Sequence, residues 1–177
     1  MSDEISLSGE LGTLVGAVLE QSAMGVADLN VEQAHYRSGA DCNSIAFDAW
    51  HVARTADNLI HFAFEREKPV WLQQGLNEAW GLPKADQGTG MPAADAHALR
   101  FPAGAALAQY CRDVAAVIVP RIAGMSDAYL ASTIAIKPQG EMSRSQIIGQ
   151  VIVAHGSAHN GMINTQRTLQ GVGGLGI

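Results

Sequence analysis

The sequence predicts an all-α fold, a four-helix bundle with a long connection between its second and third helices. Apolar residues recur at three- and four-residue spacing in four long segments, as the buried face of a helix requires. No stretch makes a convincing sheet, so helix-on-helix packing is the favoured way to form a core. The chain has 177 residues, of which 47% are hydrophobic and 16% charged. This size and composition predict one globular domain over residues 1–177.

The first helix is expected over residues 8–28. The apolar positions that share one of its faces are Leu11, Leu14, Val15, Val18, Leu19 and Met24. The polar stretch over residues 30–42 contains Gly39 and is expected to be a loop with a short turn of helix.

The second helix should begin at Asn43 or Ser44, since either side chain suits an N-cap. It should end near Glu67, because Pro69 follows and a residue before proline avoids the α region. One arc of this helix is aliphatic and comprises Ile45, Ala49, Val52, Ala56, Leu59, Ile60 and Ala63.

The connection over residues 69–102 is rich in glycine and proline. Short helical pieces are expected around residues 70–76 and 93–99, and Trp71 and Trp80 should anchor the segment by packing. A connection this long inside a compact domain is usually functional.

The third helix should start near Pro102, a residue type favoured in the first turn. Pro120 should kink or stop it, because proline lacks the backbone N–H that continues a helix. Residues 129–137 have some β character and are expected to include a short extended piece.

The fourth helix should open at Ser143, which with Gln146 has capping-box spacing, and run to Leu169 before a glycine-rich end. On it, His155 and His159 lie four residues apart and therefore one turn apart on the same face. Two imidazoles so placed can bind one metal ion. The apolar residues on the same side, which direct the pair toward the interior, are Ile148, Val151, Ile152, Met162 and Ile163.

A third histidine, His51, lies midway along the second helix and away from its aliphatic arc. Its neighbours on that side mix polar tips and aromatic rings, as a cavity lining does: Phe47, Asp48, Thr55, Asn58 and Phe62. On spacing alone, an HxxxH pair or a single histidine on a helix is more often an ordinary core or surface residue than a metal ligand. The remaining histidines, His35, His61 and His97, follow no pattern and are expected to be structural or exposed.

Charge and cysteine content exclude several classes of function. With 11 Lys and Arg against 17 Asp and Glu, the formal charge is −6, which argues against nucleic-acid binding. No apolar run approaches the roughly 20 residues of a membrane span. The acidic start, Met1 to Glu4, lacks the basic region of a signal peptide, and Cys42 and Cys111 form no CxxC pair. We therefore expect a cytoplasmic protein with reduced thiols and with neither nucleic-acid nor membrane partners.

These segments, in this order, resemble the DinB-like superfamily, in particular the metal-binding domains of mycothiol-dependent maleylpyruvate isomerase type. Residues 43–57, which contain Trp50-His51-Val52-Ala53-Arg54, are similar to its WHxxR-like segment. Residues 155–163 resemble its HxxxHxG segment, and the region of Trp71 and Trp80 resembles its tryptophan-bearing loop. The resemblance covers most of the chain.

The resemblance implies a divalent metal held by His51, His155 and His159, with the remaining coordination positions open to water or substrate. Zinc or nickel is expected, because imidazole suits both. Some members are transferases or isomerases that use low-molecular-weight thiols such as mycothiol or bacillithiol. The resemblance also implies a homodimer.

The leading functional hypothesis is a metal-dependent thiol S-transferase acting on a small-molecule substrate, in which the metal lowers the pKa of the thiol. A hydrolase would use metal-bound water instead. Against it, the residues between the paired histidines, Gly156, Ser157 and Ala158, lack the glutamate of HExxH. Asp48, one turn from His51, is a candidate to orient a ligand or to act as a base. The alternative is a non-catalytic metal-binding or stress-response binding protein of the same fold.

Overall fold

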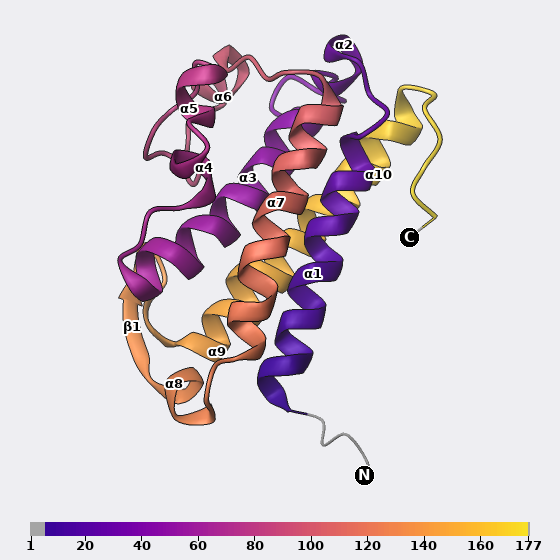
Figure 1. The fold of residues 1–177 in the computed structure, drawn as a ribbon. Helices are drawn as coiled ribbons and strands as arrows, with labels where there is room; N and C mark the ends of the chain where they lie inside the picture. Colours follow the sequence, from indigo (N-terminus) through magenta and orange to yellow (C-terminus); the bar gives the residue numbers. More distant parts are fainter. Residues whose placement is uncertain (1–5, 177) are drawn as a thin grey trace.

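The computed structural model describes residues 6–176 and is mainly helical, which confirms the predicted all-α class (Figure 1). The acidic start, Met1 to Glu4, lies outside the described residues. The long helical segments are α1 (Leu7–Val26), α3 (Ile45–Asp57) with the π-helix η1 (Asn58–Phe64), α7 (Gly104–Ala123), and the continuous run α9 (Arg144–Gln146), η2 (Ile147–Ala154) and α10 (His155–Leu169). Together they form the bundle.

Helix starts follow the capping residues of the sequence. Ser44, not Asn43, caps α3, and its side chain accepts a hydrogen bond from the Phe47 amide at 3.1 Å. The capping box at the start of α9 is present, since Ser143 and Gln146 each accept from the other's backbone N–H. η1 ends at Phe64, three residues before the expected Glu67.

α3 occupies the centre of the molecule and packs against α1, α7 and α10. We expected one buried arc, but every residue of α3 is buried. The reason is that the long connection covers its outer side. At Gly88 in that connection, φ is +91° and a Cβ atom would lie 2.6 Å from the Phe47 ring, so only glycine allows this close approach. The tertiary structure thus buries both the aliphatic side of α3 and its opposite side, which is polar and aromatic.

The connections before α7 carry the short helices α2 (Val31–Ala34), α4 (Val70–Gln73), α5 (Leu76–Ala79) and α6 (Ala93–Ala98). Buried Asp57 attaches the long connection to the bundle. Its carboxylate accepts hydrogen bonds from the amides of Val70 and Trp71 and from the Tyr110 hydroxyl, each at 2.9 Å, and lies 2.8 Å from His61 Nδ1. Because those partners lie in α3–η1, α4 and α7, one carboxylate joins three segments.

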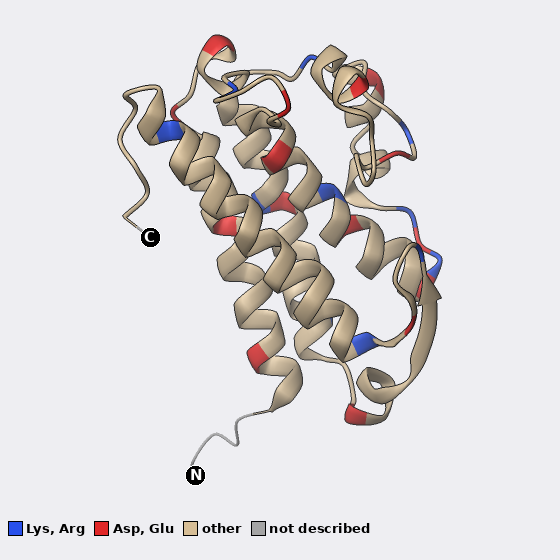
Figure 2. Ribbon diagram, turned by 180° about the vertical axis from the view of Figure 1, so that it is seen from behind, with Lys and Arg blue, Asp and Glu red and all other residues tan. Residues whose placement is uncertain are grey.

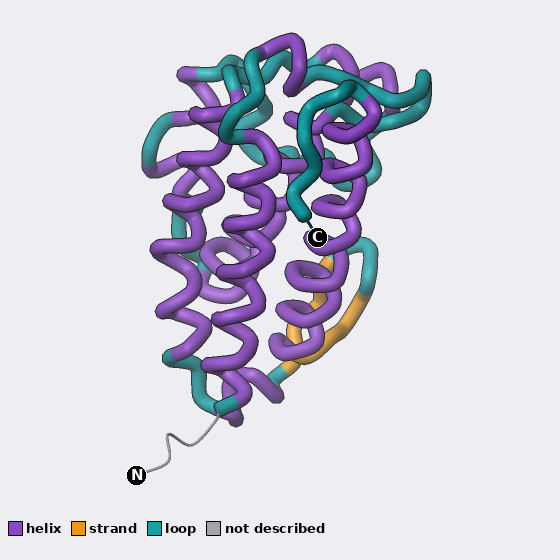
Figure 3. The backbone as a smooth tube through the Cα atoms, turned by 90° about the vertical axis from the view of Figure 1, so that its right-hand side faces the viewer, coloured by secondary structure: helices purple, strands orange, loops and turns teal. Residues whose placement is uncertain are grey.

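The region after α7 differs from expectation. Pro120 lies within α7, which continues to Ala123, so the proline does not stop the helix although its missing N–H removes one backbone hydrogen bond. Of the expected extended segment, the first part is helical, α8 (Asp127–Ala131), because Ser126 caps it. The strand β1 (Thr133–Ile136) follows and pairs antiparallel with an unexpected second strand, β2 (Gly140–Ser143). This hairpin lies along one side of the bundle (Figure 3).

The bodies of the long helices carry few charged residues, which lie mainly at helix ends and in loops (Figure 2). Within residues 6–176, no helix is both long and apolar enough to cross a membrane.

Candidate metal centre

The structure brings His51, His155 and His159 together, and we call them the histidine trio. His51 comes from the middle of α3, while His155 and His159 come from the first two turns of α10. The Nε2 atom of His155 lies 3.1 Å from Nε2 of His51 and 3.0 Å from Nε2 of His159. The candidate ligand atoms all lie within 4.8 Å of one another. The trio is thus placed where it can hold a metal ion.

Hydrogen bonds to the outer ring nitrogens orient two of these histidines. His51 Nδ1 donates to the backbone carbonyl of Gln87 at 2.5 Å, and His159 Nδ1 donates to Asp48 Oδ1 at 3.0 Å. In a neutral imidazole with its proton on Nδ1, Nε2 is an acceptor. Two acceptor nitrogens therefore face the Nε2 atom of His155, which supplies at most one proton. A cation at their meeting point satisfies all three, so the residues fit a metal ion.

Burial keeps His51 and His155 in the form that binds metal. Burial lowers the pKa of His51 from 6.5 to about 4, opposed by the hydrogen bond to the Gln87 carbonyl. Burial also lowers the pKa of His155, and the neighbouring His159 lowers it further. Both imidazoles are therefore neutral at pH 7, and neutral imidazole is the metal ligand.

Asp48 lies behind His159. It is fully buried, and its Oδ1 atom accepts hydrogen bonds from His159 and from the Asn43 side chain at 3.0 Å, whereas Oδ2 finds no partner among residues 6–176. A carboxylate on the outer nitrogen of a histidine fixes the tautomer and the ring orientation. Asp48 is therefore a positioning residue, and it does not line the cavity into which the trio opens.

A glycine lets α10 approach close enough for the trio to form. A Cβ atom on Gly156 would lie 2.6 Å from Val18 Cγ1 and 3.3 Å from Val52 Cγ1. Because Gly156 directly follows His155, any larger residue there would push the α10 histidines away from His51. The identity of this residue thus controls the distance between the two ligand-bearing helices.

Two cavities reach the trio. One, of about 290 Å³, is lined by all three histidines, Phe47 and the loop over residues 88–91. The other, of about 250 Å³, is lined by His155, Thr55 and Gln87 together with the hairpin. Among the residues that the structure describes, no carboxylate lines either cavity.

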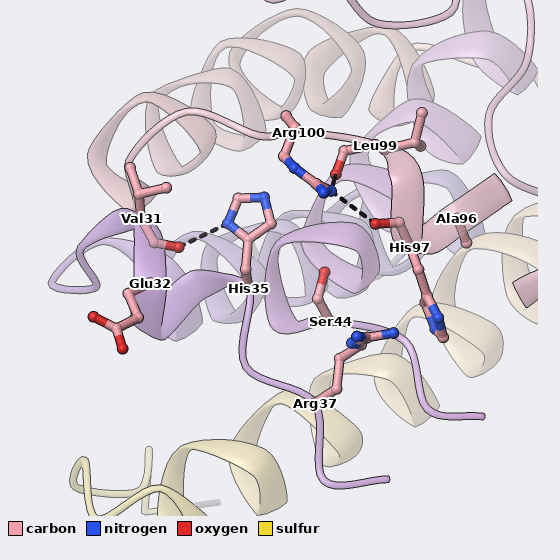
Figure 4. A pocket seen from close by; sticks show the side chains of 9 residues that line it. All are labelled: Val31, Glu32, His35, Arg37, Ser44, Ala96, His97, Leu99 and Arg100. Atoms are coloured by element: carbon pink, nitrogen blue, oxygen red, sulfur yellow. Dashed lines mark hydrogen bonds between the residues drawn. The ribbon is translucent and has the colours of Figure 1, made fainter. Parts of the chain in front are cut away.

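The other histidines lie outside the trio. His61 is buried against Asp57. His35 and His97 line a separate cavity of about 330 Å³ at the end of the bundle where α3 begins, and there His35 Nδ1 donates to the Val31 carbonyl at 2.7 Å (Figure 4). Sequence reasoning missed Gln87, because its contribution is a backbone carbonyl. The only sequence feature that pointed to a functional role for this region was the unusual length of the connection that contains Gln87.

The fold and the trio define a class of protein, a helical bundle with a three-histidine cluster at the contact of two long helices. A model of the DinB superfamily matches residues 18–163, a span that contains all three histidines. The chain belongs to the DinB superfamily. The solved structure of a conserved protein from Enterococcus faecalis has the same fold, with a TM-score of 0.80 and 18% identity over 94% of this chain and 98% of that chain. No curated protein matches the chain.

Proposed function

We propose that this protein is a metal-dependent enzyme that joins a low-molecular-weight thiol to a small electrophile, with His51, His155 and His159 as ligands of one divalent ion. The observation that carries the proposal is the convergence of their Nε2 atoms at 3.0 and 3.1 Å. Membership of the DinB superfamily supports the same assignment.

The expected ion is zinc or nickel, and when bound it supplies a Lewis acid that lowers the pKa of a coordinated thiol. The chain contributes a neutral set of ligands. Three uncharged imidazoles add no negative charge of their own, so they do not oppose the charge of a bound thiolate. Asp48, the nearest carboxylate behind the trio, is directed at His159 Nδ1 and not into the cavity.

The lining favours a thiol over water as the nucleophile. No described carboxylate lines the two cavities that reach the trio, and none occurs among the residues between His155 and His159. Without a general base, the nucleophile must lose its proton easily. On a divalent metal a thiol is deprotonated outright, whereas bound water keeps a pKa of about 7 and still gains from a base, so the thiol needs less assistance. These features therefore favour thiol transfer over hydrolysis as the function of this site.

The first test is metal content after loading and dialysis. His51→Ala and His159→Ala should each lose most of the bound zinc or nickel, because each removes one of three ligands. His97→Ala is the matched control, since His97 lies in the other cavity and should retain wild-type stoichiometry. If all three variants retain equal metal, the trio is a set of ordinary core histidines.

The second test is turnover. The metal-loaded protein is assayed with cysteine, glutathione, mycothiol and bacillithiol against 1-chloro-2,4-dinitrobenzene and monochlorobimane. We expect metal-dependent thiol conjugation with at least one pair. Bound metal without turnover of any thiol would favour the non-catalytic binding protein.

A further inference from the structure

A groove leads away from His155 beneath the β1–β2 hairpin. Its inner part is the cavity of about 250 Å³ that contains His155 and Thr55. Its outer part, about 520 Å³, lies beside η1. The two parts share four lining residues, Leu59, Gln87, Ile136 and Lys137, and therefore lie end to end along one wall.

The inner part contains an unsatisfied polar group. Thr55 is 3% exposed, and its hydroxyl has no hydrogen-bond partner among residues 6–176. A buried hydroxyl without a partner is costly to a fold, so such groups need an explanation. A polar group on a molecule bound in the inner cavity would supply the missing partner.

The outer part is cationic. Its only charged lining residues are Arg66 and Lys137, and within the described chain neither forms an ion pair. Nearby acids are engaged elsewhere: Glu65 accepts from the Tyr129 hydroxyl, and Glu67 pairs with Arg121 at 2.6 Å. In a chain with a net charge of −6, two free cations at one groove mouth favour an anionic ligand.

Arg66 occupies a backbone position that suits glycine. Its φ is +60°, and it is the only described non-glycine residue with positive φ. It follows the end of η1, where a left-handed residue usually closes a helix and is usually glycine. The guanidinium lies over the Phe62 ring, 5.5 Å from its centre. An arginine held in an unfavourable conformation at a groove mouth points to a use for its side chain.

We propose that this groove binds an elongated small molecule that carries a carboxylate. The reacting group lies at the histidine trio, a polar group contacts Thr55, and the carboxylate lies between Arg66 and Lys137. The inference rests on the proposed function, because it places the reacting end at the trio. It adds the substrate class, an acid-bearing molecule.

Glutathione is a suitable probe, because it is an elongated thiol with carboxylates, and cysteamine is a thiol without one. Zinc-loaded protein should bind glutathione more tightly than cysteamine in calorimetry. Arg66→Gln and Lys137→Gln should each weaken glutathione about threefold to fivefold, the effect of one exposed charge pair, and leave cysteamine binding and zinc content unchanged.

Arg37→Gln is the matched control, because Arg37 is an exposed arginine that lines the cavity at the other end of the bundle (Figure 4). It should not change glutathione affinity. Equal affinity in all three variants would overturn the proposal, and so would a loss confined to Arg37→Gln.

Arg66→Gly separates binding from folding. Glycine adopts a φ of +60° without strain, so this variant should melt at or above the wild-type temperature. It should nevertheless lose glutathione affinity as Arg66→Gln does. Wild-type affinity in the glycine variant would show that the Arg66 side chain contributes nothing.

A last arm distinguishes this inference from the proposed function. S-methylglutathione, which has no thiol, is titrated into metal-free protein while amide resonances are followed by NMR. Amide shifts at Thr55, Arg66 and Lys137 would support the groove. If the same protein also fails to bind zinc when zinc is added, the metal enzyme is refuted and the groove remains. Bound zinc with no shift at these amides, for glutathione or S-methylglutathione, would refute the groove alone.

Discussion

Asp48 shows how one buried side chain can control a site that it does not line. Its carboxylate is out of contact with solvent and hydrogen-bonds to Asn43 and to the outer nitrogen of His159. The backbone carbonyl of Gln87 acts in the same way on His51. At the scale of single residues, the trio therefore depends on groups that hold its imidazoles with their Nε2 atoms facing inward.

Asp48→Asn should weaken zinc binding about 10- to 100-fold, because the amide lacks the charge that favours an Nδ1–H tautomer and a basic Nε2. Affinity is measured by competition with a chromophoric chelator. Asp95→Asn, at an exposed site on α6, is the control and should bind zinc as the wild type does. Equal affinities for the two variants would contradict the positioning role.

The metal-free protein should lose stability between pH 6.5 and about 4. Burial lowers the pKa of His51 from 6.5 to about 4 in the folded state, so the unfolded chain binds more protons in that window. The loss is about 3 kcal/mol at most, at about 1.4 kcal/mol per pKa unit, and is complete below the folded-state pKa.

The measurement is urea unfolding at a series of pH values, for the chelator-treated wild type and for His51→Leu. Other groups titrate in both proteins, so the difference in slope isolates His51. The variant should have the shallower decline in unfolding free energy. Parallel profiles would mean that His51 is not held neutral by the fold.

At the scale of elements, the decisive contact is that of α10 with α1 and α3. Gly156 allows this contact, since a Cβ atom there would lie 2.6 Å from Val18 Cγ1. The same helix carries a second glycine, Gly161, whose Cβ would meet nothing within 4 Å. The two positions form a matched pair on one helix.

Gly156→Ala should destabilise the protein by about 1–3 kcal/mol and weaken zinc binding, because the added methyl pushes α10 outward. Gly161→Ala should be neutral or slightly stabilising, since alanine is the better helix former. The double variant Gly156→Ala, Val18→Ala should recover part of the zinc affinity. Thermal melts and chelator competition test all three, and failure of the double variant to recover would place the clash elsewhere.

At the scale of the whole molecule, the outer face of α1 carries three exposed large apolar side chains. Leu7, Leu14 and Met24 are 54%, 47% and 49% exposed. Exposed apolar side chains along one helix favour contact with a second copy of the chain, because a closed two-fold dimer covers the same face on both copies.

We therefore predict a homodimer through α1. Light scattering at micromolar concentration should give twice the chain mass for the wild type and the monomer mass for Leu14→Glu. Leu169→Glu, at an exposed leucine of α10, should remain dimeric. A monomeric wild type across this range would refute the dimer, and a dimeric Leu14→Glu would place the interface on another face.

Several features followed from the sequence alone, because their causes are local. The helices arise from three- and four-residue apolar spacing, and the capping boxes and N-caps from side chains within three residues of the amides they bind. The pairing of His155 with His159 follows from the helical repeat, since any two residues four apart share a face. The resemblance to the DinB superfamily depended on these ordered local patterns and is confirmed.

Only the tertiary structure decided the features that depend on contacts between distant segments. It joined His51 to the α10 pair, and placed the Gln87 carbonyl on His51 from 36 residues away and the Asp48 carboxylate on His159 from 111 residues away. It also buried α3 on all sides and brought the hairpin over Thr55. No periodicity encodes such contacts, because they arise from how whole helices and connections pack. Local spacing therefore determined the pair of histidines on α10, and packing determined the site.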